Sequence, residues 1–326
     1  MGTTLRLLFK THRFELIAIT LACLALAGGE LFMSSQLGAV ALPPDCVFVQ
    51  GSDSQGQASD PAHEQACQVK RDAYFALQGH VGEILGFGAA LPLLAGIVLG
   101  VPLVGRELES GTASLAWTLS RSRRRWLLAR AIPLMAILSV VLLIPALAAD
   151  ILEHARQPLV DPGSSFSDAG VRGPVFVLRG VMAFAVGVIS GAIVGRQIPA
   201  LIIAIAMSLA VLVGFEVGVT RWEHSLAEWR PAASFDINPA DLQFDQQYRD
   251  RATGAIVDTN AVMATAPQVN GGADSAWIDD HYVLVSLGLL GSQYGVVVAG
   301  ETAALGGLSL LGLGLGLMVV NRRRPG

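Results

Sequence analysis

The sequence predicts an all-α integral membrane protein with six transmembrane helices and with both chain ends in the cytoplasm. Of its 326 residues, 52% are hydrophobic and 15% are charged, whereas an ordinary soluble domain carries about 25% charged residues. The apolar residues gather into six runs, each close to the roughly 20 residues that a helix needs to cross a bilayer. The polar segments between the runs divide into a basic set and an acidic set, which assigns the two sides of the membrane.

The expected spans follow the apolar runs in chain order: 14–33, 84–104, 126–149, 175–195, 198–219 and 296–320. A cleaved signal peptide is the alternative for the first run, but the run is long for one and no small-x-small cleavage site directly follows it. Arg130 lies near the start of the third run, where a long side chain can reach the membrane surface. The chain 1–326 is therefore expected to form one transmembrane domain.

The outer loops are expected at 34–80, 150–174 and 220–282. The last of these carries ten acidic residues against four arginines and has room for a small folded element. Residues 283–294 are apolar but too short to span, so we expect a re-entrant or interfacial segment there.

The basic residues fix the orientation, because cytoplasmic segments carry an excess of lysine and arginine. With the N-terminus inside, thirteen basic residues face the cytoplasm in short segments. Eight lie in the long outer loops, where acidic residues outnumber them. A five-span or seven-span count would place one basic end of the chain outside.

The cysteines and glycines leave two questions open. Cys46 and Cys67 share the first outer loop and can form a disulfide if that loop faces an oxidising compartment, and two free thiols are the alternative. Small-xxx-small patterns at Gly96 and Gly100, and in the series Gly187, Gly191 and Gly195, allow helices to approach closely in lipid. With 36 glycines in the chain, some of these patterns arise by chance.

Signatures of soluble enzymes are missing from the sequence. It contains no HExxH and no CxxC motif, and we assign no catalytic, cofactor-binding or metal-binding residue. A phosphate-binding P-loop needs Gly-Lys-Ser or Gly-Lys-Thr, but Lys10 follows Phe9 and Lys70 follows Val69. The chain is therefore not expected to bind ATP by that route, and no nucleic-acid partner is expected. A proton-relay role stays open for acids near span ends, namely Glu15, Glu30, Glu83, Glu216 and Glu301.

The stretch between the second and third spans, residues 102–130, carries most of the functional signal. It holds Glu107 and Glu109, a break at Gly111 and Thr112, and an amphipathic piece at 113–119. A basic cluster follows, made of Arg121, Arg123, Arg124 and Arg125. Each such arginine would cost about 2.5–3.5 kcal/mol at the centre of a bilayer, so the stretch must lie at the membrane surface. There each arginine can hold anionic lipid headgroups, which is worth about 1 kcal/mol.

Residues 106–112, 115–118 and 121–128 resemble the corresponding loop of type-2, exporter-like ABC transporter permeases. The Ala-Trp-Thr sequence at 116–118 is similar to the variant found in permeases of high-GC Gram-positive bacteria. The resemblance implies a permease subunit of an ATP-driven exporter in the bacterial plasma membrane. It further implies that a separate ATPase subunit uses the ATP and that a second permease chain completes the path. The first outer loop is longer and more polar than this resemblance leads us to expect.

We expect 107–119 to form a short cytoplasmic coupling helix that docks on the ATPase. Gly111 would allow the turn beside Thr112, and Leu115 and Trp117 would be apolar anchors. Glu107 and Glu109 would pair with basic groups of the ATPase. The alternative is that the whole stretch is only a solvated, positively charged loop.

Two other classes of function are weighed against the exporter permease. An ion-gradient-driven secondary transporter would show inverted repeats and broken helices with central charges, but no clear repeat is visible and the charges lie at span ends. A non-transporting membrane anchor or sensor would carry a recognisable soluble output domain, and none is apparent in the sequence.

Overall fold

The computed structural model of the chain describes residues 9–40, 46, 61–113, 115, 117, 122–158, 160–235, 240–269 and 272–323. Six of its helices are long and apolar enough to cross a membrane, as expected. They are α2 (Arg13–Ala39), α3 (Pro61–Glu109), α5 (Arg123–Arg156), α6 (Gly173–Val194), α7 (Gln197–Leu226) and α10 (Tyr294–Arg322). Each expected span falls within one of them, apart from Gly195, which caps the C-terminus of α6.

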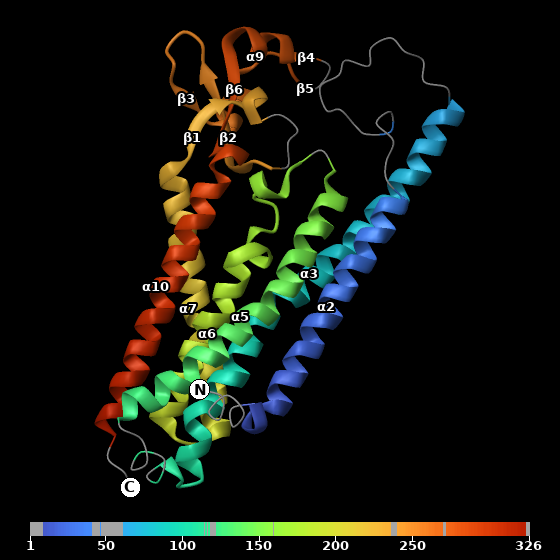
Figure 1. The fold of residues 1–326 in the computed structure, drawn as a ribbon. Coiled ribbons are helices and arrows are strands. Elements are labelled where there is room, and N and C mark those ends of the chain that lie inside the picture. The colour runs from blue at the N-terminus through green and yellow to red at the C-terminus, as the bar shows by residue number, and fades with distance from the viewer. Residues whose placement is uncertain are drawn as a thin grey trace.

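The helices run side by side, with α2 and α3 on one flank and α7 and α10 on the other (Figure 1). The start of α2 and the end of α10 lie at one end of this bundle, together with the end of α3, the start of α5 and the α6–α7 turn (Figure 1). We call this the basic end, after Arg106, Arg123, Arg124, Arg125 and Arg323. The opposite end carries the β-strands, and we call it the sheet end.

Helix α6 lies at the centre of the bundle, and nearly all of its side chains are buried. It packs against α3 through glycines that leave no room for a side chain. A Cβ atom added to Gly96 would lie 2.2 Å from the Gly180 carbonyl oxygen, and one added to Gly100 would lie 2.3 Å from the Phe184 carbonyl oxygen. Small residues that let two backbones approach are how helices associate in lipid. Of the glycines in the sequence patterns, Gly96, Gly100, Gly187 and Gly191 lie in this interface, whereas Gly195 faces Arg323 at the end of α6.

Much of the expected outer loop 34–80 is helical instead. Helix α2 continues to Ala39, and α3 begins at Pro61, well before the apolar run. Proline suits the first position of a helix, and the alanines, glutamines and leucines that follow are good helix formers. At 1.5 Å per residue, the 49 residues of α3 measure about 74 Å against a hydrocarbon core of about 30 Å. The polar first half of α3 therefore projects beyond the membrane.

The membrane-length part of the chain is helical, as expected, and a four-stranded antiparallel sheet outside it occupies much of 228–289. Its order is β1 (Glu228–Pro231), β6 (Tyr282–Leu289), β2 (Leu242–Asp250) and β3 (Ile256–Val257). Strands β4 (Gln268–Val269) and β5 (Gly272–Ala273) form a second, two-stranded sheet, and the short helices are α8 (Thr259–Thr265) and α9 (Ser275–His281). The expectation of a re-entrant segment at 283–294 is thus wrong. This run is apolar because β6 is paired on both edges and buries Val285 and Leu289 completely.

The four-stranded sheet grows directly from two transmembrane helices. Strand β1 follows α7 after Ala227, and β6 leads into α10 through the 3₁₀ turn Gly291–Gln293. In the β1–β6 ladder, Trp229 lies opposite Leu287. This pairing holds the sheet-end termini of α7 and α10 side by side (Figure 1).

Candidate functional site

The α3–α5 connection forms a tight turn at the basic end. Helix α3 ends at Glu109, and Gly111 has a φ of 70°, a left-handed conformation that glycine adopts without steric cost. The Ser110 amide donates to the Arg106 carbonyl at 3.0 Å and closes the last turn of α3. Beyond it, Ala113, Leu115 and Trp117 have helical backbone. We call the described residues of this stretch, 109–113, 115 and 117, the tip.

Among the described residues of the tip, Leu115 is the one exposed side chain with a large apolar surface. Glu109, Ser110, Gly111 and Thr112 are exposed, and the Leu115 side chain is 63% exposed. An exposed leucine among polar residues at a sharp turn is the kind of side chain that a partner protein can cover.

Trp117, the other expected anchor, faces inward and is only 8% exposed. Its ring packs edge-on against Trp126 at 6.3 Å, and the Arg123 guanidinium lies 4.5 Å from its centroid. Trp117 therefore fixes the tip against α5.

The two acidic residues of this segment have partners within the chain. The Glu107 carboxylate forms an ion pair with Arg130 of α5. The Glu109 carboxylate accepts a hydrogen bond from the backbone amide of Gln197 at 3.0 Å, at the first residue of α7. A carboxylate there also compensates the positive end of the helix dipole. Sequence reasoning missed both partners, because each contact joins segments that are distant in the chain.

Two arginines close the C-terminal ends of helices, where carbonyl groups lack intrahelical partners. Arg123 donates to the Asn321 and Arg323 carbonyls at 3.3 and 2.5 Å. Arg323 in turn donates to the carbonyls of Ala192 and Ile193 at the end of α6. These hydrogen bonds connect the start of α5 to the end of α10, and the end of α10 to the end of α6.

The remaining arginines of the predicted lipid-binding cluster differ in their placement. Arg124 and Arg125 are exposed. Arg121 lies outside the residues that the structure describes. Of the described members of the cluster, Arg124 and Arg125 are thus the exposed ones, while Arg123 is engaged with α10.

His12 lies beside this site and is 5% exposed. Burial lowers the pKa of its imidazole from the usual value, and Glu15, Arg106, Arg130 and Glu107 modify the shift. The imidazole is therefore held neutral at neutral pH among the charges of the basic end.

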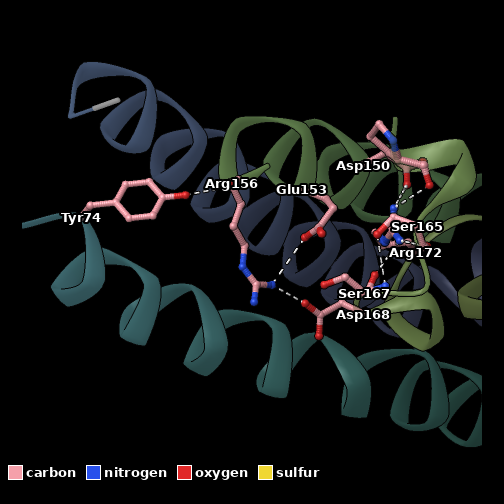
Figure 2. Close-up of polar contacts among 9 residues, drawn as sticks. Tyr74, Asp150, Glu153, Arg156, Ser165, Ser167, Asp168 and Arg172 are labelled. Carbon is pink, nitrogen blue, oxygen red and sulfur yellow. Dashed lines mark hydrogen bonds and ion pairs between the residues drawn. The ribbon is translucent and has the colours of Figure 1, made fainter. Parts of the chain in front are cut away.

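The sheet end contains a second polar cluster, which Figure 2 shows. The buried Arg172 donates to the Ser165 and Ser167 carbonyls at 2.8 and 2.5 Å. Arg156 donates to Asp168 at 2.5 Å, and its own carbonyl accepts from the Tyr74 hydroxyl at 2.5 Å. Asp150, Glu153 and the Pro162 carbonyl complete the set. The cluster connects the described residues between α5 and α6 to the adjoining ends of these two helices.

Cys46 and Cys67 are joined in a disulfide, with their Cα atoms 5.2 Å apart. It ties residue 46 to the projecting part of α3, and His63 lies beside it, with Nε2 3.6 Å from the Cys67 sulfur. The three side chains are close enough to hold a metal ion, but sulfurs in a disulfide offer no thiolate for one.

The six membrane-length helices make this chain a multi-pass membrane protein. The sequence model of the family described as ABC-2 membrane transporter related matches residues 16–220, well over half of the chain. The chain belongs to this family. The matched range includes α3, the tip, α5 and α6, whereas the sheet and α10 lie beyond it. No curated protein and no solved structure matches the chain.

Proposed function

We propose that the chain is the membrane-spanning permease subunit of an ATP-driven ABC exporter in a bacterial plasma membrane. It would form half of the substrate path with a second permease chain, homologous or identical, and a separate ATPase subunit would bind and hydrolyse ATP. Membership of the ABC-2 family supports a transport component. The sequence contains no P-loop of its own, which is in keeping with energy supplied by a partner.

In this proposal the basic end faces the cytoplasm and the sheet end faces outside, so the N-terminus is inside. The positive-inside rule supports this orientation, because the short connections at the basic end carry the arginine cluster. The acidic 220–282 segment and the Cys46–Cys67 disulfide lie at the other end, and disulfides persist in oxidising compartments.

The observation that carries the proposal is the tip. It is an exposed turn that includes residues with helical backbone, and contacts with α5 and the start of α7 hold it in place. Leu115 and the polar residues at 110–112 would contact the ATPase, with Thr112 and Gly111 at the apex. Glu107, Glu109 and Trp117 would act as positioning residues, because their partners lie in α5 and at the start of α7. Because the tip is continuous with α3 and contacts α5 and α7, it can transmit a movement of the ATPase to all three helices. Arg121, Arg124 and Arg125 would hold lipid headgroups around it.

Replacing Leu115 with aspartate tests the docking. The tagged chain is purified from native membranes in mild detergent, and ATPase polypeptide and ATP hydrolysis are measured in the eluate. We expect the wild type to retain an ATPase and Leu115→Asp to retain at least about tenfold less, because a carboxylate would be buried in the contact without a partner. Val269→Asp is the matched control, since Val269 is 51% exposed at the sheet end; it should behave as wild type. An eluate without ATPase in the wild type, or full retention by Leu115→Asp, contradicts the proposal.

A further inference from the structure

A cavity of about 290 Å³ lies between α7 and α10 in the half of the bundle nearest the sheet. The β1–β6 ladder fixes the two helices just above it. The residues that line it include Phe215, Gly218, Trp222, Gly300, Glu301 and Ala304. Gly218 and Ala304 are exposed, so the cavity opens on the side of the bundle, where lipid surrounds a membrane protein.

Glu301 is the one charged side chain that lines this cavity, and it is 8% exposed. Within the part of the chain that the structure describes, no hydrogen bond or ion pair engages its carboxylate. A buried carboxylate without a partner is costly in an apolar environment, so a cationic ligand would gain from occupying the space in front of it.

The surrounding charges favour a cation over an anion in the cavity. Glu216 and Glu223 lie close enough to act electrostatically on Glu301, and so does Arg179. Arg179 is already paired with Glu216, so among the described residues Glu301 and Glu223 have no ion-pair partner. The same charges would repel the phosphate of a phospholipid headgroup.

The rest of the lining sets the chemical class of that cation. A metal ion such as Na⁺ or Ca²⁺ requires several oxygen ligands, whereas here one carboxylate stands among apolar and aromatic side chains. The Trp222 ring packs directly on Gly300, one residue from Glu301. An aromatic ring attracts organic cations through its electron-rich face, so Trp222 near a carboxylate favours an organic ammonium or phosphonium group over a metal ion.

We propose that this cavity binds a lipophilic organic cation, which enters from the bilayer and uses Glu301 as its counter-charge. The inference concerns binding by this chain alone and does not rest on the proposed transport function.

The test is equilibrium binding to the purified full-length chain in nanodiscs, without ATPase. The probes are radiolabelled methyltriphenylphosphonium and triphenylphosphine oxide, a neutral compound of nearly the same shape. We expect saturable binding of the cation by the wild type. Glu301→Gln should weaken cation binding by at least about tenfold, as for loss of a buried charge partner, and should change binding of the oxide less than about threefold.

Two further variants serve as controls, one for the space in the cavity and one for the loss of an acid elsewhere. Gly218→Leu keeps Glu301 but fills the cavity, since a Cβ at this position meets nothing within 4 Å; it should weaken both probes. Glu83→Gln removes an acid whose side chain is 72% exposed on α3 and should change neither. The inference is overturned if the wild type shows no saturable cation binding above empty nanodiscs. It is equally overturned if Glu301→Gln or Gly218→Leu keeps wild-type affinity for the cation, or if Glu83→Gln loses as much as Glu301→Gln.

Discussion

At the scale of single residues, the ion pair between Glu107 and Arg130 decides how the tip is held. The two side chains are 21% and 32% exposed, so water screens them only in part. Removing one member leaves a partly buried charge without its partner, whereas removing both does not. The pair therefore links the last turn of α3 to the first turns of α5.

We expect Glu107→Gln and Arg130→Met each to lower the free energy of unfolding by about 1–2 kcal/mol, and the double variant by less than the sum. Thermal unfolding of the purified chain in one detergent measures all four members of the cycle. Strictly additive effects would mean that the pair contributes nothing to the tip.

The residue scale also separates what the sequence could predict from what it could not. The left-handed turn at Gly111 and the exposed Leu115 lie where local pattern placed them. The partners of Glu107, Glu109 and Arg123 could not be predicted, because they lie 23, 88 and 200 residues away in the chain. A single sequence gives no signal for such pairings. Sequence analysis therefore predicts partners outside the chain, the ATPase for the two acids and lipid headgroups for Arg123.

At the scale of elements, the glycines of the α3–α6 interface bring the backbones of the two helices into direct contact. Gly100 lies against the backbone of Phe184, and Gly187 lies against Gly100. Where two backbones touch, neither helix can move aside for a side chain without losing its neighbouring contacts.

We expect Gly100→Leu to prevent stable folding or to lower the midpoint of thermal unfolding by at least about 10 °C, as overpacking by several kcal/mol would. Gly86→Leu is the matched control on the same helix, because a Cβ there meets nothing within 4 Å. Fluorescence-detected size-exclusion after heating compares the two. Equal stability of both variants would show that the helices are not in close contact.

The elements themselves were predictable to the extent that hydropathy dictates them. The six spans follow from apolar length alone, and each lies inside a helix apart from the capping Gly195. The polar start of α3 and the strand β6 were missed for opposite reasons. The first is a helix without an apolar run, and the second is an apolar run whose partners, β1 and β2, come from polar sequence.

At the scale of the whole molecule, the proposed orientation rests on the segregation of charge between the two ends. We expect cysteines placed at Ser122 and Asn321 to be shielded in intact cells, and a cysteine at Gly254 to react with a membrane-impermeant maleimide. Native cysteines are first replaced. Ser54, a further expected outer position, lies outside the described residues. Labelling of position 122 in intact cells, at a level matching position 254, would contradict the proposed orientation.

The central claim is that the tip contacts an ATPase, and site-specific photo-crosslinking in native membranes tests it most directly. A photoreactive amino acid is placed at position 115, where the leucine side chain is 63% exposed, and in a second variant at position 254. After irradiation, crosslinked partners are identified by mass spectrometry. We predict that position 115 captures a polypeptide with a nucleotide-binding P-loop and that position 254 does not. If position 115 captures only lipid or no ATPase, while the variant is expressed and folded as wild type, the account is contradicted.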